Sequence, residues 1–171
     1  VNPQPAAIGG ATSVCEGLTV LLTEATAGGV WSSSNTAAAT VSSTKIVTGV
    51  LAGTTTISYT LPAGCFSTYA VTTNPSPSAI TGVLSGCNSN FTTTLSNGVD
   101  GGTWSSSSAI AIIGSVSGIM TSTVAATYTI SYTLPAGCKS TVAVTVNPQP
   151  AAIGGLSTVC EGLTTALTEA T

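Results

Sequence analysis

The sequence repeats itself, and the length of the repeat limits the size of the unit that folds. Residues 1–10 recur unchanged as residues 146–155, and residues 56–65 recur unchanged as residues 129–138. Repetition at a fixed period indicates that each repeat is one structural unit. We therefore expect one domain over residues 1–73, a second over 74–146, and the first third of a further repeat over 147–171, truncated or swapped into a neighbour.

Short alternating segments separated by turn residues fill each repeat. Residues 54–61 alternate the apolar Ile57 and Tyr59 with hydroxyl-bearing side chains, as a half-buried strand does. No window combines a helical period with caps, and Ser, Thr, Val and Gly are mediocre to poor helix formers. The pattern predicts an all-β chain of small β-sandwiches, with six to seven short strands each and almost no helix.

The aromatic residues recur with the repeat and are the largest candidates for its core. Trp31 and Trp104 are 73 residues apart, and so are Tyr59 and Tyr132. Tryptophan is also the side chain on which carbohydrate-binding modules stack sugars. Because each tryptophan lies between a Gly-Gly pair and a run of serines, we expect all four aromatic residues to pack in the core.

The cysteines also follow the repeat. Cys15, Cys87 and Cys160 are spaced by 72 and 73 residues, and Cys65 and Cys138 by 73. Matched spacing favours disulfides over five reduced thiols, and it indicates an oxidising, extracellular compartment. We expect one bond within each repeat, Cys15–Cys65 and Cys87–Cys138, and for Cys160 a partner outside the chain or in a neighbour. Without a CxxC pair or a histidine, no metal site is expected.

The low charge of the chain excludes several functions. Two lysines and no arginine provide no surface for nucleic acid, and the absence of histidine removes the commonest general base. The few charged residues are mostly not shared between the repeats, so we expect neither an enzyme nor a bound cofactor. The longest apolar run, residues 109–113, is too short for a membrane span.

An Asn-Pro-x-Pro element opens each repeat. Two prolines fix φ and favour an extended, semi-rigid connector. The predicted linker residues are Asn2, Pro3, Pro5, Asn74, Pro75, Pro77, Asn147, Pro148 and Pro150.

At this point a family resemblance can be stated. Residues 29–43 carry Gly-Val-Trp-Ser-Ser-Ser-Asn and Ala-Thr-Val, and residues 52–59 carry Ala-Gly-Thr-Thr-Thr-Ile-Ser-Tyr. These motifs resemble the bacterial immunoglobulin-like (Ig-like) domain of group 2, and the second repeat matches more loosely around Trp104. The resemblance implies tandem Ig-like domains of a large secreted or surface protein, each a spacer or a binding module. The cysteine pair is similar to a variant found in very long secreted proteins of Bacteroidota.

The sequence favours a structural function at a bacterial surface. We expect an extracellular filament, stalk or adhesin segment, a rod of disulfide-closed domains whose partners are copies of itself or adjacent repeats. The alternative is a module that binds glycans or a surface, and a weaker one is adhesion to ice or mineral through threonine-rich strands. Covalent glycans on the Ser/Thr-rich surface are another expectation, with Asn90 as the candidate N-linked site.

Overall fold

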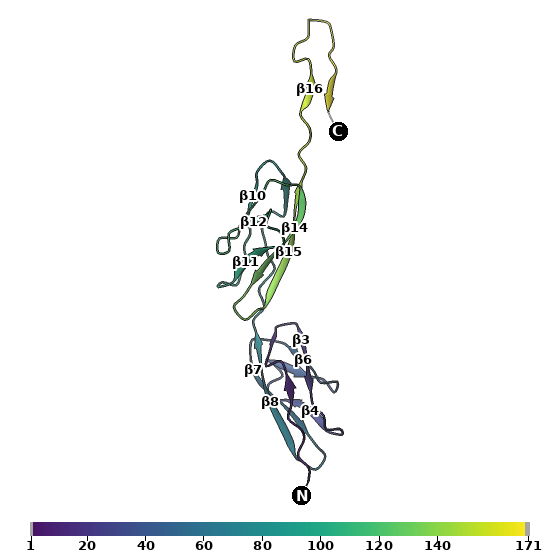
Figure 1. Cartoon of the computed structure of the whole chain (residues 1–171), viewed down its shortest axis with the longest axis vertical. Coiled ribbons are helices and arrows are strands. Elements are labelled where there is room, and N and C mark those ends of the chain that lie inside the picture. The colour runs from purple at the N-terminus through teal and green to yellow at the C-terminus, as the bar shows by residue number, and fades with distance from the viewer. Residues whose placement is uncertain (1, 170–171) are drawn as a thin grey trace. The chain divides into compact units, whose positions relative to one another are not determined.

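The computed structural model describes residues 2–169, and they form β-strands joined by turns and loops (Figure 1). No helix long and apolar enough to cross a membrane occurs in this part of the chain. The contacts divide the chain into two compact units. The first holds the residues up to Ala79 with Asn97–Thr103 and Tyr132–Ser140, and the second holds Ile80–Ser96, Trp104–Ser131 and the residues from Thr141 onward. Residues 1, 170 and 171, which the predicted repeats include, lie outside the described residues.

The strands of residues 9–74 form two four-stranded sheets. One has the order β1 (Gly9–Gly10), β3 (Thr19–Thr23), β6 (Ile46–Gly49) and β5 (Ala39–Val41). The other has the order β2 (Ser13–Cys15), β8 (Phe66–Asn74), β7 (Gly53–Thr60) and β4 (Val30–Ser33). The pairs are antiparallel except for β2 and β8, which run parallel.

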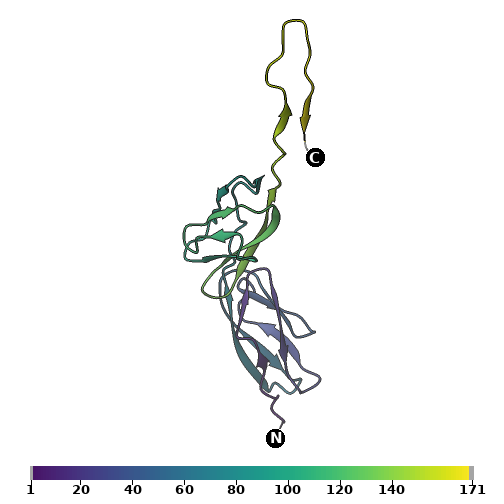
Figure 2. The ribbon, with the colours of Figure 1, turned by 45° about the horizontal axis from the view of Figure 1, so that its top comes forward.

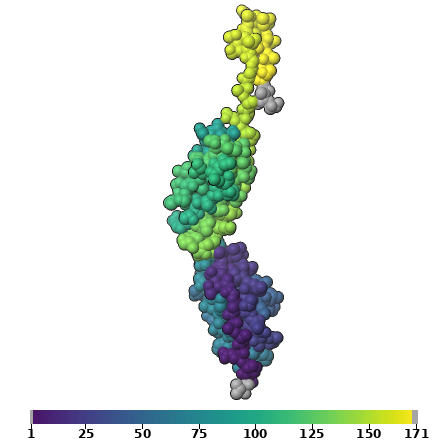
Figure 3. All heavy atoms as spheres, viewed as in Figure 1, coloured from purple at the N-terminus to yellow at the C-terminus, as the bar shows by residue number. Residues whose placement is uncertain are grey.

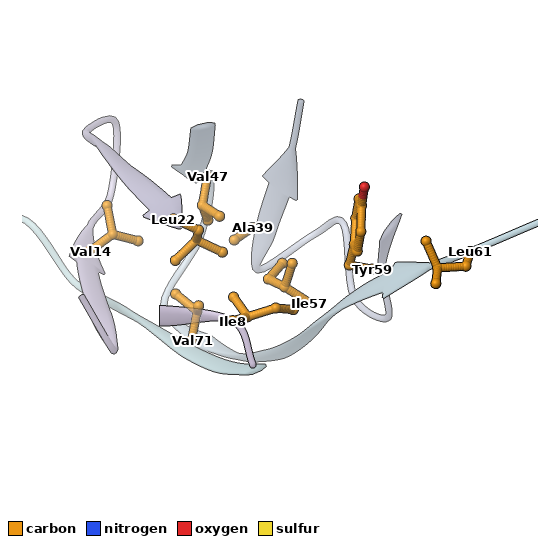
Figure 4. Packing of buried hydrophobic residues seen from close by; sticks show 9 residues of the cluster. All are labelled: Ile8, Val14, Leu22, Ala39, Val47, Ile57, Tyr59, Leu61 and Val71. Carbon is orange, nitrogen blue, oxygen red and sulfur yellow. The ribbon is translucent and has the colours of Figure 1, made fainter. Parts of the chain in front are cut away.

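The two sheets bury one core between them. Strand β3 turns Leu22 inward and Leu21 outward, and β7 turns Ile57 and Tyr59 inward. This is the alternation that a strand with one buried face requires. Figure 4 shows the buried cluster contributed by both sheets and their loops: Ile8, Val14, Leu22, Ala39, Val47, Ile57, Tyr59, Leu61 and Val71.

A buried tyrosine fixes a loop at the same place in each repeat. The Tyr59 hydroxyl accepts a hydrogen bond from the Gly29 N–H (2.8 Å) and donates one to the Thr26 carbonyl (2.7 Å). The Tyr132 hydroxyl accepts from the Gly102 N–H (2.8 Å) and donates to the carbonyl of Val99 (2.7 Å). Each phenol therefore contributes to the core with its ring and satisfies two backbone groups with its oxygen.

The strands of residues 85–147 repeat the topology of the four-stranded sheet around β8. The order β11 (Thr103–Ser106), β14 (Ala126–Thr133), β15 (Lys139–Asn147) and β9 (Ser85–Cys87) corresponds to the order β4, β7, β8 and β2. A second sheet has the order β10 (Phe91–Thr94), β13 (Ile119–Ser122) and β12 (Ile112–Ile113). The predicted all-β, Ig-like fold is thus confirmed, whereas the domain boundaries at 73 and 146 stay a prediction.

Residues 147–169 form a hairpin of β16 (Ile153–Gly155) and β17 (Leu167–Glu169), visible in Figure 2. Gly154 pairs with Thr168 and Gly155 with Leu167, the same register as Gly9 with Thr23 and Gly10 with Leu22. The segment therefore adopts the β1–β3 pairing of the first repeat.

The hairpin of β16 and β17 exposes the residues that form a core in the first repeat. Ile153 is 71% exposed and Leu167 is 66% exposed, whereas their counterparts Ile8 and Leu22 are 6% and 1% exposed. Figure 3 shows the atoms of this segment, in yellow, exposed on the face that the figure presents. The hairpin thus carries an apolar face that the described residues leave uncovered.

Candidate functional site

The two cysteines of the first repeat lie at opposite ends of one sheet. Cys15 ends β2, opposite Asn74 at the end of β8, whereas Cys65 lies in the turn that precedes β8. The nine residues of β8 therefore separate them, by about 30 Å at 3.3 Å per residue. A disulfide needs Cα atoms within about 7 Å. The prediction of a Cys15–Cys65 bond is therefore wrong.

Among residues 2–169, one disulfide forms, and it joins Cys15 to Cys138 with a Cα–Cα distance of 5.7 Å. Both cysteines belong to the first compact unit, although they come from different sequence repeats. The predicted Cys87–Cys138 bond is wrong for the same reason as the first, because Cys87 lies opposite Asn147 and Cys138 lies in the turn before β15. The disulfide thus connects two repeats and closes neither.

We call Cys15 and Cys87 linker-end cysteines, because each lies opposite the asparagine that opens an Asn-Pro-x-Pro element, and extend the name to the equivalent Cys160. We call Cys65 and Cys138 hairpin cysteines, because each lies in the turn before a nine-residue strand. The observed bond joins one cysteine of each kind.

The linker beside Cys15 is held by the next residue, Glu16. The Glu16 N–H donates to the Asn74 carbonyl (3.0 Å), and the Ser76 hydroxyl donates to the Glu16 carbonyl (2.9 Å). The Glu16 carboxylate accepts from the Ala52 N–H (2.7 Å) and from the Ser76 N–H (3.2 Å). Backbone and side chain of Glu16 therefore both fix the first residues of the linker.

The same arrangement recurs beside Cys87 with an uncharged residue. The Asn88 N–H donates to the Asn147 carbonyl (2.9 Å), and the Asn88 side-chain oxygen accepts from the Gln149 N–H (3.0 Å). Asn88 thus reproduces two of the three hydrogen bonds that Glu16 makes with Asn74 and Ser76. A charged and an uncharged acceptor thus make the same side-chain contact to the linker in the two repeats.

Glu16→Ala is expected to lower the stability of the first unit by about 1 kcal/mol, because two N–H donors lose an acceptor that is only partly buried. For a unit of this size that corresponds to about 5 °C in melting temperature. Calorimetry of the two proteins measures it. The control is Glu161→Ala, the same substitution at the equivalent, exposed position. Equal shifts for both variants would contradict the role assigned to Glu16.

The predicted linker residues do not all lie outside strands. Asn74 and Asn147 are the last residues of β8 and β15, whereas the prolines that follow them lie in loops. Pro5 and Pro77 are buried, and Pro150, at the equivalent position, is exposed. Pro5 and Pro77, each of which precedes a complete repeat, are therefore packed into a folded unit.

The aromatic residues of the two repeats differ in burial. Tyr59, Tyr132 and Trp104 are buried, whereas Trp31 is half-buried and packs on Tyr59 with 4.8 Å between the ring centroids. Gly118 contributes to this difference, because a Cβ there would lie 3.1 Å from the Trp104 ring. The first repeat has Lys45 at the equivalent position.

The charged groups of the described residues serve local structure. The buried Glu24 accepts a hydrogen bond from the Thr26 N–H (2.9 Å), and the Lys45 ammonium donates to the Glu24 carbonyl (2.6 Å). No group of three or more His, Cys, Asp or Glu side chains within residues 2–169 is placed to hold a metal ion.

Asn90, the candidate glycosylation site, borders a groove in the second unit. Its side chain is exposed and its backbone has a φ of 60°. The groove combines hydroxyls with two isoleucines, and its lining is Asn90, Phe91, Thr92, Ile110, Ile112, Thr121, Ser122 and Thr123.

Comparison with known proteins identifies the class of the fold. Residues 4–72 match the family model of the bacterial Ig-like domain (group 2). No curated protein matches the sequence.

One solved structure with a TM-score above 0.5 agrees with this class. The C-terminal 282-residue fragment of intimin, solved in complex with the intimin-binding domain of the translocated intimin receptor, is 15% identical with a TM-score of 0.54. The alignment covers 85% of this chain and 64% of the fragment. Murine CEACAM1b is 11% identical with a TM-score of 0.36, over 84% of this chain and 99% of that one. Domains 1–6 of the surface layer protein SbsC are 17% identical with a TM-score of 0.33, over 81% of this chain and 25% of that one. Together with the family match, the intimin similarity establishes an Ig-like fold.

Proposed function

We propose that this chain is a structural segment of an extracellular bacterial filament, stalk or adhesin, built from tandem Ig-like repeats. The observation that carries the proposal is the disulfide between Cys15 and Cys138, which connects two repeats covalently. Such a bond supports a role in transmitting load along a series of repeats. Disulfides persist in oxidising compartments, which favours a location outside the cytoplasm.

Three further features support a structural role without catalysis. The linker contacts of Glu16 recur at Asn88, so the junction between repeats is itself a repeated design. The charged side chains described above bind backbone groups, and the two that line a common pocket, Glu24 and Lys45, are already engaged in such hydrogen bonds. The hairpin of β16 and β17 repeats the register of β1 and β3, which supports a series of like repeats.

Labelling of intact cells tests this proposal. Antibodies raised against the 171-residue chain are expected to label the surface of unpermeabilised source cells, and electron microscopy is expected to locate the label on filaments or stalks. A pre-immune serum is the control. Label that enters only after permeabilisation would contradict an extracellular function.

The groove beside Asn90 favours one alternative, a module that binds glycans or a surface. Threonine and serine hydroxyls beside apolar side chains are suited to sugars. A glycan array separates the two functions, because a spacer binds nothing on it. Binding that Ile112→Asp abolishes and Ile46→Asp leaves intact would favour the alternative, since both isoleucines are exposed and Ile46 is remote in sequence from the groove.

A further inference from the structure

Asn97 and Gly98 form the one Asn-Gly pair of the sequence. In such a pair the backbone nitrogen of the glycine can attack the asparagine side chain, because glycine has no Cβ to obstruct the ring that forms. Both residues belong to the first compact unit, as does Ser78, which follows the linker residue Pro77. Asn97 is half-buried and Gly98 is exposed, so water reaches the pair. The pair is therefore reactive by its sequence, and the groups around it determine how fast it reacts.

One hydroxyl, that of Ser78, contacts both groups that would react. The Gly98 N–H donates to Ser78 Oγ at 2.8 Å, and the Ser78 hydroxyl donates to Asn97 Oδ1 at 3.2 Å. A Cβ at residue 98 would lie 3.1 Å from Ser78 Oγ, so glycine gives the hydroxyl room beside the backbone. Ser78 therefore contacts the nitrogen that would attack and the oxygen of the amide that would be attacked.

The side-chain amide of Asn97 is held at both of its polar atoms. Oδ1 accepts a second hydrogen bond from the Val99 N–H at 3.1 Å. Nδ2 donates to the Ser78 carbonyl at 2.6 Å and to the Ser140 hydroxyl at 3.4 Å. Two donors on Oδ1 stabilise the negative charge that develops on this oxygen during an attack, as the donors of an oxyanion hole do. The contacts therefore orient the amide and activate its carbon.

The first repeat has an acid where the second has this asparagine. Glu24 is equivalent to Asn97, and Ala6 is equivalent to Ser78. Glu24 Oε1 accepts a hydrogen bond from the N–H two residues further on, at 2.9 Å, as Asn97 Oδ1 does, whereas Glu24 Oε2 has no partner. The first repeat thus shows that the fold accepts a carboxylate at this position, which is the group that deamidation of Asn97 would leave there.

We propose that Asn97 is a self-modifying residue, and that the Ser78 hydroxyl catalyses its deamidation in the folded protein. The Gly98 nitrogen attacks Asn97 Cγ while Ser78 Oγ takes the N–H proton and passes its own proton to Oδ1. The Cγ–Nδ2 bond then breaks, the proton on Oδ1 moves to Nδ2, and ammonia leaves behind a cyclic succinimide. Water opens this ring to aspartate or isoaspartate, and no step needs an oxidant or a reductant.

The modification changes how the linker is held. The amide donor that now binds the Ser78 carbonyl is lost with the ammonia, and the new carboxylate offers no donor in its place. Residue 97 then no longer binds the backbone that follows Pro77. The inference goes beyond the proposed function, because it assigns a chemical change to one repeat of the chain.

Incubation of the folded full chain in mildly alkaline buffer made with ¹⁸O-water tests the proposal. Cleavage after lysine and before aspartate isolates residues 46–99, and mass spectrometry measures how much of residue 97 has become an acid that carries a solvent oxygen. A new cleavage before residue 97 distinguishes aspartate from isoaspartate. Ser78→Ala is expected to slow the conversion at least about tenfold, because a positioned acid–base group is lost.

Two further variants separate the hydroxyl from the linker as a whole. Ser78→Thr keeps a hydroxyl at residue 78 and is expected to keep the rate of the parent chain. Ser76→Ala is the matched control, because it removes another hydroxyl of the same linker, one that donates to the Glu16 carbonyl. It is expected to leave the rate of conversion at Asn97 unchanged.

Three results would overturn the proposal. An Asn97 that stays an amide in the folded chain would show that no reaction occurs there. Conversion of Ser78→Ala as fast as that of the parent chain, or faster, would show that the hydrogen bonds protect Asn97. A Ser78→Thr chain as slow as Ser78→Ala would exclude a role of the hydroxyl. Circular dichroism confirms that the variants are folded, and a negative result concerns residue 97 alone, so the proposed function still depends on the labelling experiment.

Discussion

Replacing Leu22 with alanine is expected to lower the free energy of unfolding of the first unit by about 3 kcal/mol. Leu22 is 1% exposed and lies in the cluster between the two sheets. The truncation removes buried methyl groups and leaves a cavity that the surrounding strands fill only in part. Since small domains have total stabilities of roughly 5–15 kcal/mol, this is a large fraction. Urea unfolding of a Trp104→Phe background measures the loss, because Trp31 then reports on the first unit alone.

Leu21→Ala is the matched control, because Leu21 is the neighbouring residue of the same strand and is 62% exposed. It is expected to change the free energy of unfolding by less than about 0.5 kcal/mol. If Leu21→Ala were the more costly of the two substitutions, β3 would present its opposite face to the core, as after a register shift of one residue.

Removing the disulfide is expected to have the second large effect. The double variant Cys15→Ser/Cys138→Ser loses a cross-link that closes a loop with a sequence separation of 123. We expect the free energy of unfolding of the first unit to fall by about 4–5 kcal/mol, because the unfolded chain regains the entropy that the closed loop denies it. The same fluorescence experiment measures it, and Cys87→Ser, which removes an exposed free thiol, is expected to have no effect.

Peptide mapping checks that the bond responsible is the one between residues 15 and 138. After blocking of free thiols, cleavage after both lysines and before the single aspartate separates Cys15, the pair Cys65 and Cys87, Cys138, and Cys160 onto four peptides. The expected cross-link joins residues 1–45 to residues 100–139. A cross-link between residues 1–45 and 46–99 would instead show that Cys15 pairs with Cys65 or Cys87, and it would contradict the bond to Cys138.

The alternation of residues was enough to predict the fold. In the segment around Ile57 and Tyr59, hydroxyl-bearing residues separate apolar ones, and the structure places Ile57 and Tyr59 in the core. The period of two in such a segment fixes which face is buried before any partner strand is known. The repeated Leu-Pro-Ala-Gly-Cys turn likewise marked the hairpin that precedes β8 and β15.

The pairing of the cysteines could not be predicted from spacing. The nearly equal spacing within the pairs Cys15 and Cys65, and Cys87 and Cys138, is compatible both with bonds within repeats and with bonds between them. The choice depends on the parallel pairing of β2 with the end of β8, which places Cys15 opposite Asn74 and far from Cys65. Parallel pairing between strands distant in the sequence leaves no local signal. The sequence feature closest to this pairing is the Asn-Pro pair at the end of the nine-residue strand, because Cys15 lies opposite that asparagine.

The partial exposure of Trp31 could not be predicted from the sequence either. Both tryptophans follow glycines and precede serines, so their local sequences are nearly the same. They differ at a position 14 residues further on, where the second repeat has Gly118 close to the Trp104 ring and the first repeat has Lys45. Such compensation between distant positions requires the tertiary structure.

The covalent connection between residues 15 and 138 determines how the chain responds to tension. A pull applied at the two chain ends passes along the backbone to Cys15, crosses the sulfur–sulfur bond, and continues from Cys138. The residues between them carry none of this load. A segment with a sequence separation of 123 would extend to about 400 Å at the usual length per residue. Because the bond closes this segment into a loop, the segment does not add to the end-to-end length even when the domains unfold. The disulfide thus limits how far the molecule can be stretched, and reducing agents would make the same chain more extensible.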